Sequence, residues 1–561
     1  MTRLGGSLEV HLSSTSGTSA TRRVSSMTIN RLTRLSVTAF AVAAAALAAA
    51  PAATAGHGGG KPPTLPGGYK HLVVIYEENH SFDNLYGSWG DVGGEQVDGL
   101  ADASPATSTQ IAQDGTPYAC LPQDDVNLTS PPLSSTCTDP AHGIAASHFA
   151  NAPFSIDDYL QPEDTSCPAP GDPTNVHIGQ GQPGGCTRDL VHRFYQEQYQ
   201  IDGGRQDRYT TGSDAVGLTQ GTYDTQALPI YRYLHAPGAP KYVIADHFFQ
   251  AAFGGSFLNH QWLIAARSPL DTNPALVAAS PARNSVLDTN GMPVESAKPY
   301  PQYVPTQPGT VDGQLTQQCA DPTVNDAVAA CGNFAVNTIQ PQSTPRGGGA
   351  RLPRIDDSQY PNIGDELTDA DISWNWYSGG WDDAAAGHPG PLFQYHHQPF
   401  NYFANYAPGQ PGRVHLQDET EFVSAAQDGT LPTVSFVKPN GAENEHPGYA
   451  SESTGSDHLV DLLQTIENGP QAGNTLVVVT YDEFGGQWDH VSPPQVDAWG
   501  PGTRIPALLI SRSLKHSGVD HTTYDTTSIL ATIEHSYGLP ALSSRDASVN
   551  DLTDAVAAGG R

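Results

Sequence analysis

Acidic side chains and one histidine occur close together near the C-terminal end of the chain. Asp482 and Glu483 are adjacent, and Asp489 and His490 follow them after two glycines. Two adjacent carboxylates repel each other unless a cation, a proton or hydrogen-bond donors offset their charge. A divalent metal ion is the commonest reason for such a pair. We therefore predict that Asp482 and Glu483 are metal ligands.

Two other segments carry polar side chains that fit the same chemistry. Glu78 and Asn79 stand in the sequence Glu-Glu-Asn-His near the N-terminal end, and both offer an oxygen ligand. Ser256 follows two glycines in the sequence Phe-Gly-Gly-Ser. A hydroxyl that follows such a turn beyond a strand is well placed to act as an exposed nucleophile.

The elements that must position these residues are short apolar runs rich in β-branched residues. Such runs are typical of strands at the centre of a parallel sheet. The runs cover residues 71–76, 241–245, 433–437, 476–480 and 504–510, and residues 372–377 alternate in a strand-like way. Polar groups follow the first and fourth of these runs, at the ends where ligands bind in open α/β sheets.

Three helices are predicted between these strands. They cover residues 189–200, a segment capped by Ser456-Asp457, and residues 526–537 up to Gly538. Strand, polar loop and helix recur along the chain. This order predicts the α/β class, as a layered α/β/α sandwich with a mostly parallel central sheet.

The N-terminal segment has the features of an export signal. Arginines precede an apolar run over residues 35–50, and a small-x-small cleavage site ends at Ala55. The run is shorter than the roughly 20 residues that cross a membrane. We predict a cleaved leader over residues 1–55 and a secreted or cell-envelope protein. The sequence does not decide whether translation starts at Met1 or at Met27. It also leaves open whether export follows the general or the twin-arginine route.

The remaining chain is predicted to hold one catalytic domain. A Gly/Pro-rich linker over residues 56–68 precedes it, the domain covers residues 69–545, and residues 546–561 form a C-terminal tail. Loop-rich insertions interrupt the domain at about residues 88–187 and 282–353.

Six cysteines, an even number, fit an exported protein with disulfide bonds. We predict three local disulfides that pin the insertions: Cys120–Cys137, Cys167–Cys186 and Cys319–Cys331. The chain has no Cys-x-x-Cys sequence, so a structural zinc site on thiolates is not expected. The formal net charge of −32 argues against nucleic acid or an anionic membrane as a steady partner.

Four sequence blocks, in this order, resemble those of a known family. They are residues 78–87 (Glu-Asn-His-Ser-Phe-Asp-Asn-Leu-Tyr-Gly), 254–260 (Gly-Gly-Ser-Phe-Leu-Asn-His), 444–447 (Asn-Glu-His-Pro) and 480–491 (Thr-Tyr-Asp-Glu-Phe-Gly-Gly, then Trp-Asp-His-Val). The chain resembles the bacterial phosphoesterase family of acid phosphatases and phospholipases C, a branch of the alkaline-phosphatase-like superfamily. Residues 199–205, 374–377 and 395–400 are more similar to the acid phosphatase side.

The resemblance implies a role for each matching residue. One divalent metal ion would be held by oxygen ligands from Glu78, Asn79, Asp482, Glu483 and Ser256. Ser256 would also be the nucleophile, at a position where many relatives on the phospholipase side have threonine. The residues that would bind phosphate or protonate the leaving oxygen are histidines: His260, His446, His490, His396 and His397. Magnesium, calcium, manganese, iron and zinc all fit such ligands.

We predict a secreted, metal-dependent acid phosphatase that hydrolyses phosphomonoesters through a phosphoserine. The alternative is a phospholipase C, which would need an apolar rim that Phe253, Phe257 and Trp262 could supply only in part; lipid contact is expected to be transient at most. A binding protein without turnover would lack the nucleophile or part of the metal set, and both are present. A sulfatase is disfavoured because Cys-x-Pro-x-Arg is absent. The natural substrate and the oligomeric state are open.

Overall fold

The computed structural model describes residues 64–123, 133–158, 187–269, 286–294, 300–311, 355–358 and 360–561. These residues belong to one unit of the chain, Pro62–Arg561. The predicted leader over residues 1–55, and the first part of the linker, lie outside the described residues. No helix among the described residues is long and apolar enough to cross a membrane.

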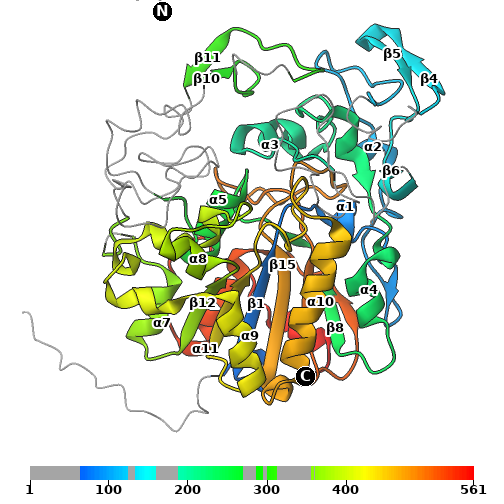
Figure 1. The fold of residues 1–561 in the computed structure, drawn as a ribbon. Coiled ribbons are helices and arrows are strands. Elements are labelled where there is room, and N and C mark those ends of the chain that lie inside the picture. Colours follow the sequence, from blue (N-terminus) through cyan, green and yellow to red (C-terminus); the bar gives the residue numbers. More distant parts are fainter. Residues whose placement is uncertain are drawn as a thin grey trace, which may run out of the picture. The chain divides into compact units, whose positions relative to one another are not determined.

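An eight-stranded sheet forms the centre of this unit (Figure 1). Its strands, in spatial order, are β13 (Leu416–Asp418), β12 (Trp374–Ser378), β14 (Val434–Lys438), β1 (His71–Glu77), β15 (Thr475–Tyr481), β16 (Ala507–Ser511), β8 (Lys241–Ala245) and β17 (Gly518–Asp520). The strands from β13 to β15 are parallel, β16 is antiparallel to both its neighbours, and β17 is parallel to β8. The predicted α/β class with a mostly parallel sheet is confirmed.

The core lies around the two central strands, β1 and β15. Their apolar side chains are fully buried on both faces of the sheet, which explains the continuous apolar runs in the sequence. Leu72 is opposite Leu476 and Glu77 is opposite Tyr481. Because the strands are parallel and in register, their carboxyl ends lie at the same edge.

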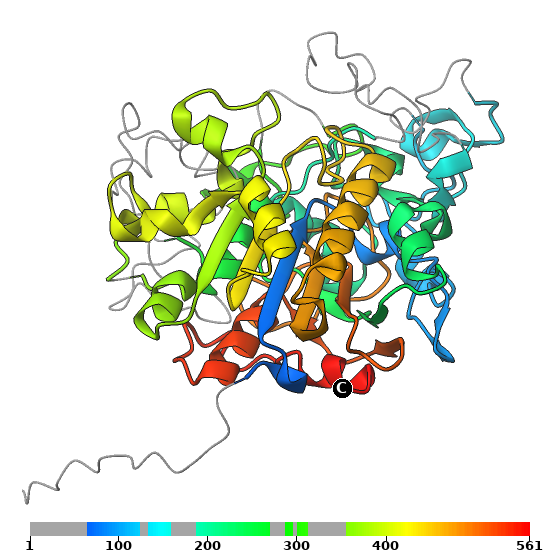
Figure 2. The ribbon, with the colours of Figure 1, turned by 60° about the horizontal axis from the view of Figure 1, so that its bottom comes forward.

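Helices cover both faces of the sheet. The helices are α1 (Phe82–Leu85), α2 (Pro105–Ser108), α3 (Phe194–Ile201), α4 (Pro229–Leu234), α5 (Ser256–Ala265), α7 (Ile363–Asp369), α8 (Trp381–Ala386), α9 (Glu419–Asp428), α10 (Glu452–Asn468), α11 (Thr527–Tyr537) and α12 (Thr553–Ala558). In Figure 1 and Figure 2, α9 and α10 lie in front of β1 and β15, whereas Figure 1 shows α11 behind the sheet. α10 buries Leu459, Leu462 and Leu463 on one side, as its apolar spacing predicts.

Short two-stranded ribbons lie outside the main sheet. They pair β10 (Val286–Asp288) with β11 (Pro308–Val311), β18 (Tyr524–Asp525) with β9 (Phe248–Phe249), β2 (Asp91–Val92) with β3 (Glu95–Gln96), β4 (Cys137–Asp139) with β5 (Ile144–Ser147), and β6 (Phe154–Ser155) with β7 (Gly221–Thr222). The predicted disulfide Cys120–Cys137 is confirmed. The other two predicted pairs lie outside the described residues.

Two helix boundaries differ from the sequence prediction. α3 begins at Phe194, because the segment before it is extended and its Val191 N–H donates to Asp214 Oδ1 at 2.9 Å. The predicted cap of α10 at Ser456 is wrong, since the N-cap is Ser451, whose Oγ accepts from the Thr454 N–H at 3.0 Å.

The other boundary differences are local. β16 begins at Ala507 and not at residue 504, because the preceding proline has no N–H to donate to a ladder. Residues 546–561, predicted as a tail, contain α12, which buries Ala555 and Val556.

Candidate metal centre

The carboxyl ends of β1 and β15 bring the two predicted pairs of metal ligands together. Glu78 follows Glu77 and Asp482 follows Tyr481, and these strand ends are opposite each other in the register. The backbone N–H of Asn79 donates to Asp482 Oδ1 at 3.2 Å. The side chains of Glu78, Asn79, Asp482 and the adjacent glutamate are buried.

A glycine shapes the turn that follows the second pair. Gly485 has a φ of +62°, and a Cβ at this position would lie 2.2 Å from the carbonyl oxygen of Asn79. The Gly485 N–H donates to Glu483 Oε2 at 2.6 Å. Asn79 also has a positive φ, 62°, a conformation in which asparagine is enriched among non-glycine residues. Only glycine fits this close approach between the two loops.

Ser256 is the first residue of α5. The turn before it is held by Glu197, whose carboxylate accepts from the Gly254 N–H at 2.5 Å and from the Thr503 N–H at 2.7 Å. The Ser256 hydroxyl donates to Glu78 Oε2 at 3.4 Å. Unpaired N–H groups and the helix dipole favour negative charge at a helix N-terminus. An anionic group beside Ser256 would therefore be stabilised.

Glu78 contacts more partners than any other predicted ligand. Its Oε1 lies 2.7 Å from His397 Nε2 and 2.7 Å from Lys438 Nζ, and its Oε2 lies 3.6 Å from His446 Nε2. Burial raises the pKa of Glu78, but the charges of Lys438 and His397 outweigh burial and hold the pKa well below its usual value. Glu78 is therefore ionised although it is fully buried.

His446 faces the site with one ring nitrogen. Its Nδ1 donates to the carbonyl oxygen of Pro447 at 2.7 Å, and its Nε2 accepts from Asn79 Nδ2 at 2.9 Å. This assignment follows from the partners, since a carbonyl can only accept and an amide nitrogen can only donate. Burial lowers the pKa of His446. The ring is therefore neutral, with an electron pair directed into the site.

The remaining predicted histidines near Ser256 form a group of rings. His260 donates from Nδ1 to the Ser256 carbonyl oxygen at 2.7 Å, and this nitrogen lies 3.7 Å from Asp482 Oδ2. The rings of His260 and His397 are stacked with centroids 5.5 Å apart, and His396 lies edge-on to His260 at 5.4 Å. Burial lowers the pKa of all three histidines.

Two residues at the site were not identified from the sequence. Lys438, the last residue of β14, is fully buried and also donates to the Glu77 carbonyl oxygen at 3.0 Å. His192 places Nε2 3.5 Å from Glu483 Oε1, with its ring 6.2 Å from that of His446. Lys438 directly follows a predicted core strand, and that position was the available signal. His192 carried no comparable signal.

His490 lies between two aspartates, Asp83 and Asp98. Its Nδ1 is 2.6 Å from Asp83 Oδ2 and its Nε2 is 3.0 Å from Asp98 Oδ1. The buried Arg504 completes this cluster, with Nη2 3.0 Å from Asp83 Oδ1 and Nε 3.0 Å from Asp489 Oδ1. The contacts of His490 are thus those of a buried ion-pair network, and they join it to none of the predicted metal ligands. Asp489 is likewise paired with an arginine.

The residues present fit a divalent cation. Asn79 Oδ1, Asp482 Oδ2 and Glu483 Oε1 are buried and accept no hydrogen bond from the described residues. One potential ligand atom from each of Glu78, His260 and Asp482 lies within 4.8 Å of the other two. Burying acceptors without partners costs free energy, which a cation at this position would offset. Carboxylate and amide oxygens are common ligands of hard divalent ions.

The raised pKa values of two of these carboxyl groups also indicate that the site favours a bound positive charge. Burial, with the charge of Glu78, raises the pKa of Asp482 to about 8. Burial, with the charge of Asp482, raises the pKa of Glu483 well above its usual value. A bound cation would favour the ionised forms of both groups, because metal ligands bind in the deprotonated state.

A parallel-sheet edge that joins carboxylates, an amide, a serine and histidines defines an α/β protein with a candidate metal-dependent active site. The chain belongs to the Phosphoesterase family, whose family model matches residues 69–540. The predicted family resemblance is thereby confirmed. Membership supports the prediction of a hydrolase that acts on phosphate ester bonds.

The chain is similar to several curated proteins. It is 23% identical over 544 residues to "Phospholipase C A" of Mycobacterium tuberculosis, which covers 89% of this chain and 79% of that protein. It is 28% identical over 254 residues to "Phospholipase C B" of the same species, covering 38% of this chain and 47% of that protein. A "Non-hemolytic phospholipase C" of Burkholderia pseudomallei is 29% identical over 216 residues, covering 31% and 29%. The chain thus spans about half the length of phospholipase C B.

Solved structures with detectable similarity include a protein in the alkaline phosphatase superfamily from Vibrio parahaemolyticus. The similarity covers 33% of this chain and 50% of that chain, with 10% identity and a TM-score of 0.22. A putative sulfatase from Bacteroides thetaiotaomicron covers 38% of this chain and 60% of that chain, with 10% identity and a TM-score of 0.23.

Proposed function

We propose that the chain is a metal-dependent hydrolase of phosphomonoesters that uses Ser256 as its nucleophile. The observation that carries this proposal is the contact of the Ser256 hydroxyl with Glu78 Oε2, 3.4 Å away at the N-terminus of α5. Glu78 and the helix N-terminus would act on different groups in the reaction. The carboxylate attracts the hydroxyl proton, whereas the helix N-terminus favours the negative charge of a phosphoryl group.

The residues around Ser256 provide the other parts of phosphoryl transfer. A divalent cation held by Glu78, Asn79, Asp482 and Glu483 would supply charge neutralisation and lower the pKa of a bound oxygen. Ser256 attacks phosphorus and becomes a phosphoserine, and water then releases phosphate. The neutral Nε2 of His446 can accept a proton and return it to the leaving oxygen.

Lys438 and the stacked histidines set the charge of the site. Lys438 keeps Glu78 ionised, so that the carboxylate can accept a hydrogen bond from Ser256. His260 and His397 are buried and their pKa values are lowered by burial. Approach of a phosphate dianion would favour their protonated forms, which supports the assignment of these rings as phosphate ligands.

The apolar residues near Ser256 support a phosphomonoester rather than a lipid substrate. A lipid-cleaving site needs exposed apolar side chains around it. Phe257 and Trp262 are buried in the core, and Phe253 is only partly buried. Large exposed hydrophobic side chains in the described part of the chain are Val286, Val304, Val414 and Val496, and none of them belongs to α5 or the loop before it.

Phospholipase C activity is the second candidate function, and the names of the similar curated proteins favour it. It would use the same nucleophile and the same metal ligands on a phosphodiester. The difference between the two candidates lies in the groups that bind the alcohol portion of the substrate.

Parallel assays on p-nitrophenyl phosphate and on phosphatidylcholine vesicles would distinguish these candidates. We expect turnover of the monoester that is lost in Ser256→Ala, lost on dialysis against a chelator, and restored by a divalent metal ion. Diacylglycerol release at a greater specificity constant would favour the phospholipase. Full monoester turnover by Ser256→Ala would contradict the proposed nucleophile for both candidates.

We also propose that the chain is exported and cleaved near Ala55. The disulfide Cys120–Cys137 supports an oxidising compartment. N-terminal sequencing of the protein recovered outside the cytoplasm should begin at residue 56. A mature chain that retains the apolar run over residues 35–50 would contradict this proposal.

A further inference from the structure

A second cluster of potential metal ligands lies where α9, α10 and the loop after β14 meet. One ligand atom from each of Glu419, Glu443 and His458 lies within 4.8 Å of the other two. Glu419 is the first residue of α9, His458 lies in the second turn of α10, and Glu443 is in the loop after β14. Within the part of the chain that the structure describes, no hydrogen bond or ion pair joins these residues to the ligands of the candidate site described above, so the cluster is a separate feature.

The ion pairs within the cluster leave a buried carboxylate oxygen, Glu419 Oε2, without a partner among the described residues. His458 Nε2 lies 2.9 Å from Glu419 Oε1 and 3.9 Å from Glu443 Oε2. Burial lowers the pKa of His458, but the contact with Glu419 outweighs burial and raises the pKa, whereas the contact with Glu443 is too long for a hydrogen bond. Both His458 Nε2 and Glu419 Oε2 are buried and find no hydrogen-bond partner among the described residues. Glu419 is only 8% exposed.

The unpartnered atoms of Glu419 and His458 favour a bound cation. Helix capping does not explain Glu419, because the capping box of α9 uses Asp418 and Glu421. A buried acceptor without a partner costs about 1–3 kcal/mol. An imidazole nitrogen with an electron pair, placed between two carboxylates, can coordinate one ion with all three groups.

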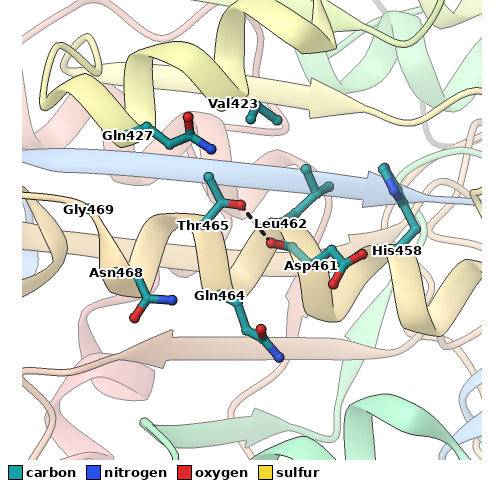
Figure 3. A pocket seen from close by; sticks show the side chains of 9 residues that line it. All are labelled: Val423, Gln427, His458, Asp461, Leu462, Gln464, Thr465, Asn468 and Gly469. Carbon is teal, nitrogen blue, oxygen red and sulfur yellow. Dashed lines mark hydrogen bonds between the residues drawn. The ribbon is translucent and has the colours of Figure 1, made fainter.

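Solvent can reach the cluster from one side. A pocket of about 560 Å³ lies between α9 and α10 and includes His458 and Asp461 in its lining. Figure 3 shows Asp461 on the same stretch of α10 as His458, with Val423 and Gln427 of α9 opposite. The Glu443 side chain is 42% exposed. Of the three proposed ligands, His458 lines this pocket.

We propose that Glu419, Glu443 and His458 form a second metal site, which binds a first-row transition-metal ion such as Zn²⁺. One imidazole and two carboxylates, completed by water, form a ligand set found at zinc sites. The imidazole disfavours Mg²⁺ and Ca²⁺, which prefer oxygen ligands. The three ligands come from three elements, so the ion would fasten the loop after β14 to α9 and α10.

This placement gives the second site a structural consequence. Glu443 is three positions before His446, on the same loop. An ion that fixes Glu443 would reduce the motion of this loop and so hold His446 against Asn79. The proposal does not depend on the proposed function, because the metal can bind whether or not the chain hydrolyses phosphate esters.

Zinc binding by the full chain tests the proposal when the first site has been disabled. The background is the double variant Asp482→Asn/Glu483→Gln, stripped with a chelator and loaded with Zn²⁺. We expect about one equivalent of Zn²⁺ to remain after gel filtration, and added Zn²⁺ to raise the melting temperature. Adding His458→Gln should remove both effects, and adding Glu443→Gln should weaken binding at least about tenfold.

A matched control is Glu95→Gln, which changes an exposed glutamate in β3 and should leave Zn²⁺ binding unchanged. Glu443→Gln keeps the test decisive if His458→Gln does not fold, because the Glu443 side chain is partly exposed and the substitution preserves its size. A background variant that retains no Zn²⁺ would overturn the proposal. Retention that is equal in the Glu443→Gln, His458→Gln and Glu95→Gln variants would overturn it as well.

Discussion

Replacing His490 by glutamine should destabilise the chain and change how its stability depends on pH. Burial lowers the pKa of His490, but hydrogen bonds to Asp83 and Asp98 outweigh burial and raise the pKa to about 10. The ring is therefore a cation at neutral pH. Because the folded-state pKa lies above the unfolded value, protonation stabilises the folded state. That contribution is complete below about pH 6.5 and is lost as the pH rises through about 10.

The size of this contribution follows from the two pKa values. A rise from 6.5 to about 10 corresponds to about 5 kcal/mol at about 1.4 kcal/mol per tenfold change in affinity for the proton. About 4 kcal/mol of this remains at pH 7, and about 1 kcal/mol remains at pH 9. A glutamine amide still donates hydrogen bonds to a carboxylate, so we expect His490→Gln to cost about 2–4 kcal/mol at pH 7.

Urea unfolding of both proteins at pH 7 and pH 9 measures the effect. The wild-type free energy of unfolding should fall by about 2–3 kcal/mol more than that of the variant over this range. His521→Gln is the matched control, since His521 also pairs with an aspartate, Asp246, but is 53% exposed. Because the imidazole of His521 is half exposed and solvated, its pairing with the buried Asp246 contributes only about 0–1 kcal/mol, and the control should unfold almost as the wild type does.

One outcome would refute the reasoning about His490. If His490→Gln unfolded like the wild type at both pH values, the ring would not be a stabilising cation. If the folded variant had also lost phosphate ester hydrolysis, the sequence-based assignment of His490 to the phosphate site would be favoured instead.

Three further predictions concern the site and the disulfide. Lys438→Met removes the buried cation beside the site, so hydrolysis should fall at least about 100-fold and stability by about 3–5 kcal/mol. Gly485→Ala forces a Cβ against the Asn79 carbonyl oxygen, so activity and metal affinity should fall together in turnover and metal titration. Cys120→Ser opens a disulfide between residues 17 apart in sequence and should cost about 3 kcal/mol in urea unfolding.

Controls separate these effects from general damage. Gly473→Ala places a Cβ whose nearest neighbour atom is 3.9 Å away, so metal affinity should not change. Full turnover by Lys438→Met, or unchanged metal affinity in Gly485→Ala, would contradict the assigned geometry. For the disulfide, a reductant should remove the difference in stability between the wild type and Cys120→Ser, and a difference that persists in the reductant would argue against the prediction.

Local sequence pattern determined the strands at the centre of this protein. Residues 71–76 and 476–480 are continuous apolar runs because both faces of these strands are buried, and any fold that buries a parallel sheet requires such runs. The polar groups that follow were visible for the same reason, since Glu78 and Asp482 come immediately after the strands end. The antiparallel direction of β16 could not be predicted from the sequence, because a buried apolar strand has the same residue pattern in either direction.

Charge partners were decided by tertiary structure. A lysine after a strand is usually solvated, and nothing around Lys438 in the sequence indicates that Glu78, 360 positions earlier, lies 2.7 Å away. His490 is only seven positions after Glu483, yet the turn between them directs its ring to Asp83. Sequence proximity therefore suggested a common site for two groups that have different partners.

The amino-acid sequence by itself determined which segments are strands, which polar residues stand at their ends, and the family to which the chain belongs. Tertiary structure decided which of those polar residues meet. The physical reason is that apolar periodicity is a local property of the chain, whereas the partner of a buried charge depends on strand order and register across the whole sheet. The same distinction applies to Glu419, Glu443 and His458. These residues are separated in the sequence and come together only in the fold.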